Sequence, residues 1–151
     1  TPVFYEQSEH WKIGIGHSTT GFKAISFVNS VETKDGGTHV NNIDWQITSY
    51  LREKIKRKYR VDVKPSELRH HLYLFINCTV INPASSSQPK EQPITAPKDF
   101  GTSHTLSEKV LRQVLNSEII QSVLDWIERK KEADERSKLR KLKYFWFIIY
   151  K

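Results

Sequence analysis

The chain contains six histidines and one cysteine, side chains that can bind metals or act in catalysis. His70 and His71 are adjacent, so in a β-strand they point to opposite faces. No two histidines have HxxxH spacing and no CxxC pair exists, which argues against a zinc site. Cys78 alternates with apolar residues, a pattern that favours a buried, inert thiol over a nucleophile. The sequence therefore predicts neither a metal site nor a catalytic residue in this chain.

Two segments have residue types that bind phosphate groups. Asp35-Gly36-Gly37-Thr38 precedes a predicted helix, and free amides at a helix N-terminus attract anions. A turn before a capped helix explains the same residues, and no GxGxxG motif or Walker lysine is present. Lys90 follows Gln88 and Pro89 in a proline- and serine-rich stretch, where it is either a solvated charge or a phosphate contact. Composition leaves both readings open for each segment.

The charge distribution indicates a polyanionic partner. The chain has 24 lysines and arginines against 17 aspartates and glutamates, a net charge of +7 and an isoelectric point near 9.5. The surplus gathers in two segments, because Leu51–His71 holds eight cations and three acids while Glu128–Lys143 holds eight and four. Basic clusters of this kind favour nucleic acid or nucleotide phosphate as the ligand.

A length of 151 residues predicts one domain with an appendage. We expect a domain over residues 1–127, followed over 128–151 by a charged helix and an aromatic tail. The single cysteine excludes an internal disulfide and favours an intracellular, reducing compartment. The longest apolar run, Tyr144–Tyr150, is far shorter than the roughly 20 residues that span a bilayer.

Strands and helices are both expected, which indicates an α/β fold. Alternating apolar and polar residues predict strands over 10–17 and 22–28, joined as a hairpin. The segment 69–81 alternates in the same way, but its second face is half-apolar too, which is typical of a central strand.

The predicted helices carry their apolar residues at spacings of three or four. The first covers 40–59, and Thr38 or Asn41 is its expected cap. A capping box over 105–108 precedes the next helical stretch, which is interrupted at Asn116-Ser117 and stays helix-prone to about Leu142.

Several ordered motifs resemble type IIA DNA topoisomerases, in the form found in eukaryotic and T-even phage enzymes rather than in bacterial gyrase B. The resemblance covers residues 3–142 and rests on FVNSV at 27–31, KDGGTHV at 34–40, VKPS at 63–66, HLYLFINC at 71–78, NP at 82–83, SQPKE at 87–91, FG at 100–101 and LSEK at 106–109. It implies the transducer domain of the ATPase region. That domain has a ribosomal protein S5 domain 2-like α/β fold, in which helices back a mixed sheet with a left-handed βαβ crossover and a C-terminal helix extends away.

The resemblance also implies what the parent protein does. Such an enzyme uses ATP and Mg²⁺ to pass one DNA duplex through another, and the transducer couples ATP binding and hydrolysis to that passage. The expected partners are duplex DNA, an ATP-binding domain, a DNA-cleavage core and further topoisomerase subunits, as a homodimer or hetero-oligomer, without a membrane. The expected compartment is the nucleus of a eukaryote or the cytoplasm of a phage's bacterial host. The chain alone, which lacks the catalytic domains, is expected to bind no cofactor and to be inactive.

Two groups of site residues follow from the resemblance. Gln88 and Lys90 match the loop that senses the γ-phosphate of ATP, although Pro89 stands where the family has threonine. Proline removes one amide donor but leaves the lysine in place. The family's eukaryotic branch also has a lysine-rich segment after the first transducer helix that contacts DNA. The matching cationic cluster here consists of Lys54, Lys56, Arg57, Lys58 and Arg60.

Two other classes of protein compete with this interpretation. One is a stand-alone nucleic-acid-binding module of S5-like fold, and the other is a MutL-type mismatch-repair ATPase fragment. The FVNS, GGTH and FINC segments argue against both. The aromatic tail Tyr144–Tyr150 departs from the family pattern, which continues with polar residues.

Overall fold

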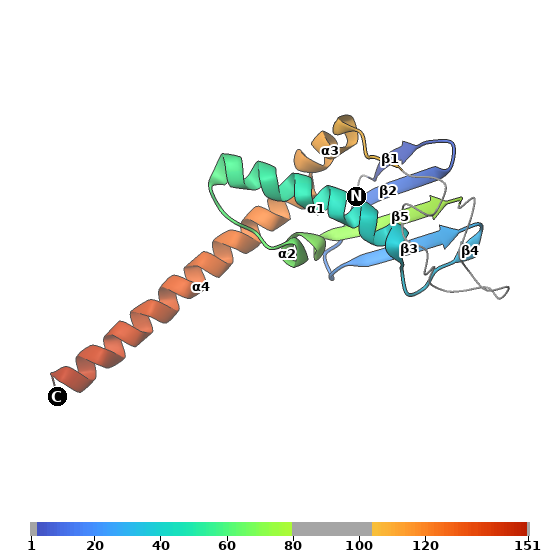
Figure 1. Ribbon diagram of the computed structural model, residues 1–151. Coiled ribbons are helices and arrows are strands. Elements are labelled where there is room, and N and C mark those ends of the chain that lie inside the picture. Colours follow the sequence, from blue (N-terminus) through green and yellow to red (C-terminus); the bar gives the residue numbers. More distant parts are fainter. Residues whose placement is uncertain (1–2, 80–103, 151) are drawn as a thin grey trace.

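The computed structural model describes residues 3–79 and 104–150, which form a mixed five-stranded sheet and four helices (Figure 1). The strands are β1 Phe4–Gln7, β2 Trp11–His17, β3 Lys23–Val28, β4 Val31–Glu32 and β5 Leu72–Cys78. The helices are α1 Thr38–Tyr59, α2 Pro65–Arg69, α3 Glu108–Leu115 and α4 Glu118–Ile149. The mixed α/β class predicted from the sequence is confirmed.

The sheet has the strand order β1-β2-β5-β3-β4. Strand β5 is central, as its two apolar faces predict, and pairs antiparallel with β2 and parallel with β3. The predicted hairpin over residues 10–28 is wrong, because β5 lies between β2 and β3. The turn after β2 bonds instead to the start of β5, where the Ser18 amide donates to the His71 carbonyl at 3.0 Å. Alternation identified both strands but carries no information about their partners.

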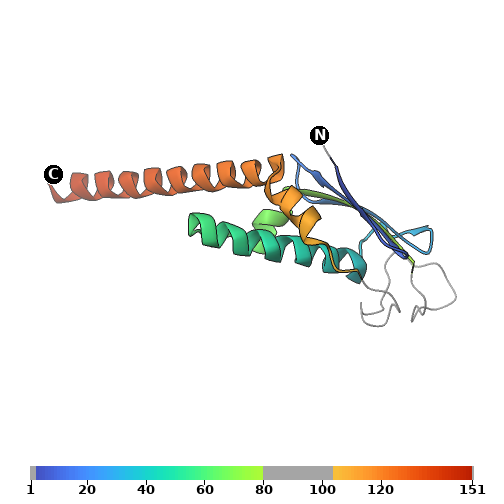
Figure 2. The same cartoon turned by 90° about the horizontal axis from the view of Figure 1, so that it is seen from above.

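The connection between the parallel strands β3 and β5 passes through α1, which lies across one face of the sheet (Figures 1 and 2). Viewed from the helix side with both strands pointing up, β5 lies to the left of β3, so the crossover is left-handed. About 98% of such crossovers in proteins are right-handed. This uncommon feature agrees with the fold that the motifs imply.

The hydrophobic core lies between the sheet and the helices. Ile13 and Leu74 from the sheet, and Ile43, Ile47 and Leu51 from α1, have at most 1% of their surface exposed. Each such side chain contributes roughly 1.5–3 kcal/mol of hydrophobic free energy. The core therefore fixes α1 against β5 and against the helices α2 and α3.

The N-terminal caps of α1 and α3 differ from those predicted. Gly37 occupies the N-cap position of α1 and provides no side-chain bond, while Asn41 lies inside the helix and donates its amide to the Gly37 carbonyl at 3.0 Å. In α3 the cap is Ser107, whose hydroxyl accepts from the Val110 amide at 3.3 Å. Thr105 precedes that cap. Each helix start has several neighbouring residues that could serve as the cap. The sequence alone does not show which of them has the backbone angles of the N-cap.

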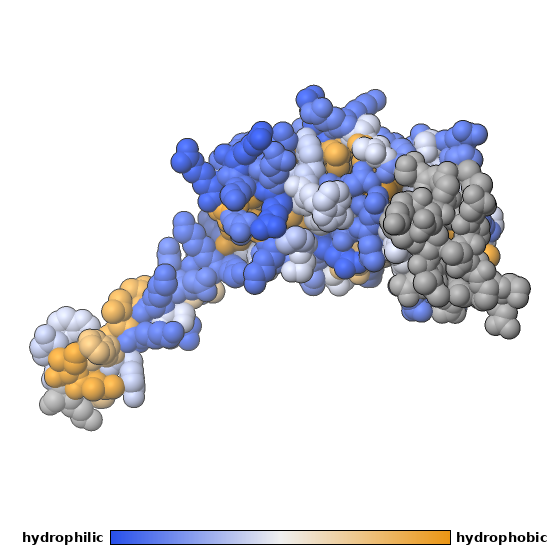
Figure 3. Space-filling model, viewed as in Figure 1, coloured by the Kyte–Doolittle hydropathy of each residue, from blue (hydrophilic) through white to orange (hydrophobic). Residues whose placement is uncertain are grey.

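Helix α4 continues to Ile149, beyond the predicted end near Leu142, and projects away from the sheet (Figures 1 and 2). Every described residue from Glu128 onward is exposed, and Tyr144–Tyr150 form an apolar end (Figure 3). The division between residues 127 and 128 falls inside this single helix and stays a prediction. Within the described residues, no helix is both long and apolar enough to cross a membrane.

Candidate nucleic-acid interface

The predicted DNA-binding cations lie together on the last turns of α1. Leu51 and Ile55 face the core, so the positions between and after them point outward. Four members of the cluster are exposed and Lys54 is half-buried; the cluster consists of Lys54, Lys56, Arg57, Lys58 and Arg60. The structure therefore brings all five predicted residues to one end of one helix.

The helix ends at Arg60, which has left-handed backbone angles with φ 54° and whose amide donates to the Lys56 carbonyl at 3.0 Å. Arg52 then holds the following segment, because its guanidinium donates to an Asp62 carboxylate oxygen at 3.0 Å. This exposed ion pair ties the segment after the cluster back to α1, while the buried Leu51 and Ile55 hold the end of the helix itself in place.

Local partners hold the cationic side chains only weakly. Arg57 forms an ion pair with Glu53 at 2.9 Å, and the Lys54 amine lies 5.4 Å from the centre of the Tyr50 ring. Exposed pairs of this kind are worth roughly 0.2–1 kcal/mol. A DNA phosphate that approaches the cluster can therefore compete with these contacts at little cost.

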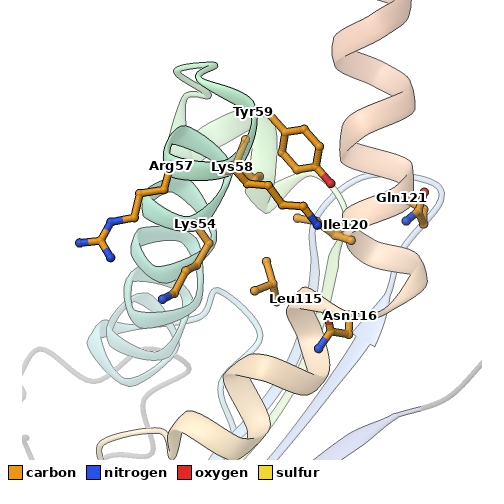
Figure 4. A pocket seen from close by; sticks show the side chains of 9 residues that line it. Lys54, Arg57, Lys58, Tyr59, Leu115, Asn116, Ile120 and Gln121 are labelled. Carbon is orange, nitrogen blue, oxygen red and sulfur yellow. The ribbon is translucent and has the colours of Figure 1, made fainter.

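A cavity of about 420 Å³ opens beside the cluster, between the end of α1 and the α3–α4 junction (Figure 4). Lys58 extends across it toward α4, while Arg57 points away from α4 (Figure 4). The cavity is lined by Lys54, Ile55, Arg57, Lys58, Tyr59, Leu115, Asn116, Ile120 and Gln121. Asn116 and Gln121 have no motif that would have marked them, since their place beside α1 depends on tertiary packing.

The second basic segment, residues 128–143, lies on the projecting part of α4 and is exposed. Its base is tied to the domain, because the Lys130 amine donates to a Glu67 carboxylate oxygen of α2 at 3.0 Å. Nearer the sheet, Ser122 of α4 hydrogen-bonds to His17 at 2.9 Å. These contacts fix the direction in which α4 leaves the domain.

Cys78 is buried in β5, as its alternation with apolar residues predicts. Burial raises the pKa of its thiol to about 12, so the sulfur stays protonated at neutral pH. A thiolate nucleophile is thereby disfavoured at this position.

His39 is a structural residue that the sequence analysis did not identify. Its side chain is 0% exposed, and its Nε2 lies 3.1 Å from the hydroxyl of Thr33, which in turn bonds to Ser26 of β3. Burial lowers the pKa of His39 to about 4. The neutral ring therefore joins the start of α1 to the β3–β4 hairpin.

The other histidines do not form a metal centre in the described part of the chain. The rings of His17 and His71 stack with their centres 6.5 Å apart, and His70 meets His71 edge-on. Burial, together with the charges of His70 and His17, lowers the pKa of His71. Among the residues that the structure describes, no group of three or more histidine, cysteine or acidic side chains could hold a metal ion.

Two further segments are candidate phosphate contacts from the sequence: Asp35–Thr38 and Gln88–Lys90. Gly36 has φ 80°, which suits glycine, and its amide donates to the Thr33 carbonyl at 3.1 Å, so the Asp35–Gly37 segment forms a turn before α1. Gln88, Pro89 and Lys90 lie outside the described residues, and their predicted role stays a prediction.

Comparison with known proteins identifies the class to which this fold and cationic helix end belong. The family model described as DNA gyrase B matches residues 5–142, and the chain belongs to this family of type II DNA topoisomerases. The tail after Leu142 lies beyond the match.

Individual relatives show that the chain is similar to eukaryotic DNA topoisomerase 2. The chain is 48% identical over 134 residues to the mitochondrial DNA topoisomerase 2 of Dictyostelium discoideum, covering 87% of this chain and 10% of that protein. It is 39% identical over 139 residues to mouse DNA topoisomerase 2-beta, covering 91% and 9%. The chain thus spans about a tenth of the length of these relatives.

The solved structures show which part of a topoisomerase the chain resembles. The ATPase and transducer domains of Balamuthia mandrillaris topoisomerase II match with a TM-score of 0.80 and 38% identity, over 86% of this chain and 34% of that one. The ATPase region of Saccharomyces cerevisiae topoisomerase II matches with a TM-score of 0.74 and 34% identity, over 82% and 32%. The predicted transducer fold is confirmed, and the two alternative protein classes are not supported.

Proposed function

We propose that the chain is the transducer segment of an ATP-dependent type II DNA topoisomerase, an isomerase in which it couples ATP binding and hydrolysis to the passage of a DNA duplex. The observation that carries this proposal is the match of nearly the whole chain to the ATPase and transducer region of topoisomerase II. The cationic end of α1 supports a DNA contact within that function.

The partners and reactants of the parent enzyme follow from the same proposal. ATP would bind to a separate ATP-binding domain together with Mg²⁺, and DNA cleavage would take place in a further core of the enzyme. Lys90, with Gln88, would contact the γ-phosphate from this chain. That contact favours the closed arrangement only while the γ-phosphate is present, as a switch between two states requires.

The DNA contact would be made through Lys54, Lys56, Arg57, Lys58 and Arg60. Lysine and arginine contacts to phosphate do not depend on base sequence and weaken with salt. Such a contact suits a duplex that must move past the domain. The proposal includes assembly as a homodimer or hetero-oligomer with other topoisomerase subunits, and location in a nucleus or in the cytoplasm of a bacterial host.

The proposal predicts a division of activities between the chain and its parent. The purified chain should neither hydrolyse ATP nor relax supercoiled DNA, because both reactions need groups from the other domains. The parent enzyme should do both, and its DNA relaxation should require ATP. Inhibitor-sensitive ATP hydrolysis by the pure chain, measured as phosphate release, would contradict the assignment as a transducer.

A further inference from the structure

The cavity beside the cationic cluster has the composition of a site for the DNA backbone rather than for a free cation or an apolar ligand. Lys54, Arg57 and Lys58 line one side, where Lys58 reaches across the cavity while the guanidinium of Arg57 points away from α4 (Figure 4). Among the described residues no carboxylate lines the cavity. Asn116 and Gln121 lie on the opposite side and are exposed, with the Gln121 amide at the outer edge of α4, beyond Ile120 as seen from Lys58 (Figure 4). The NH₂ groups of both side chains can donate to phosphate oxygens.

Between these polar groups lies an apolar surface made by Ile55, Leu115 and Ile120. A phosphate needs charged and polar donors, whereas the deoxyribose beside it presents carbon atoms to the protein. The cavity volume is about 420 Å³, the space taken by on the order of ten water molecules. This volume is large enough for the phosphate and the deoxyribose together.

We propose that this cavity seats one phosphate of duplex DNA with its deoxyribose, and that Asn116 and Gln121 are DNA-contact residues. The inference rests on the proposed function and extends the DNA contact from α1 to the α3–α4 junction. Lys58 supplies the charge from α1, since its side chain reaches across the cavity toward α4 (Figure 4). A duplex held in this way touches α1 and the start of α4 together, so its position is coupled to the helix that leaves the domain.

The test is binding of the full 151-residue chain to a fluorescent duplex of mixed sequence, measured by anisotropy over a range of salt concentrations. Asn116→Ala and Gln121→Ala should each weaken binding about 2- to 10-fold, the effect of one lost hydrogen bond. The slope of log affinity against log salt should stay unchanged, because a neutral amide releases no counterion. Lys58→Gln should reduce that slope by about one.

A matched pair of charge variants makes the test specific. Gln121→Glu places a carboxylate at the edge of the cavity and should weaken binding by about 10-fold or more, since it repels the phosphate at short range. Gln113→Glu changes the net charge equally at an exposed position of α3 that does not line the cavity, and should have a much smaller effect. Thermal melting of each variant checks that it is folded.

Equal losses from Gln121→Glu and Gln113→Glu would overturn the cavity as a phosphate site, while leaving the cationic cluster as a DNA contact. Failure of the wild-type chain to bind duplex DNA at low salt would instead overturn the proposed DNA contact itself. The two failures are therefore distinguishable within one set of measurements.

Discussion

Lys90→Ala in the intact parent enzyme is expected to slow ATP turnover about 10- to 200-fold. A charge-assisted bond from lysine to phosphate is worth roughly 1.5–3 kcal/mol, and each 1.4 kcal/mol is a factor of ten in rate when the bond is made in the transition state. ATP-driven duplex passage should fall with hydrolysis. DNA cleavage should persist, because it takes place in a separate core.

The control for this prediction is Lys98→Ala, a lysine in the same proline-rich stretch but outside the Gln88-Pro89-Lys90 motif. It should leave ATP turnover close to that of the wild type. Pro89→Thr, which restores the family residue, should also be mild because it leaves the charge in place. Equal slowing by both alanine variants would mean that general surface charge is responsible and that Lys90 is not the sensor.

His39 is expected to make the folded domain sensitive to acid. The pKa of His39 is near 6.5 in an unfolded chain and about 4 in the fold. Between these pH values the ring is therefore protonated in the unfolded state and neutral in the folded state. Above about pH 6.5 His39 is neutral in both states and does not lower the stability of the fold. As the pH falls from 6.5 toward 4, protonation of His39 in the unfolded state progressively lowers the free energy of unfolding. At 1.36 kcal/mol per pH unit, the loss in free energy of unfolding is about 3 kcal/mol.

Urea denaturation of wild type and His39→Gln at pH 7 and pH 4.5 measures this effect. The variant has no titrating ring at this position, so its free energy of unfolding should change less between the two pH values. His71→Gln is the comparison, because its pKa shift has the same direction but its ring is only half-buried. An identical pH dependence in wild type and His39→Gln would show that the His39 ring does not remain neutral in the fold.

Local patterns predicted the elements that depend on local chemistry. The apolar spacing in α1 and the two apolar faces of β5 gave the right element types, and charge counting located the basic segment Leu51–His71 in which the cations at the end of α1 lie. The interruption at Asn116-Ser117 is also present, because Ser117 caps α4 through the Ile119 amide. In each case neighbouring residues carry the signal.

Features that depend on distant segments were not predictable in this way. The insertion of β5 between β2 and β3 joins strands that are separated by α1 and α2, and no alternation pattern records it. Buried His39 hydrogen-bonds to Thr33, which bonds in turn to Ser26 of β3, thirteen positions before His39 in the chain. The cavity likewise joins residues of α1 to Asn116 and Gln121, about sixty positions further along the chain.

The central claim, that the end of α1 holds duplex DNA, is tested most directly by the salt dependence of binding. Lys56, Arg57 and Lys58 are replaced together by glutamine, and a control replaces Lys12, Lys23 and Lys109, which are exposed elsewhere. The slope of log affinity against log salt should fall by about 2–3 units in the first variant and much less in the second, at roughly one unit per lost phosphate contact. A folded first variant with the wild-type slope would show that these cations only face solvent.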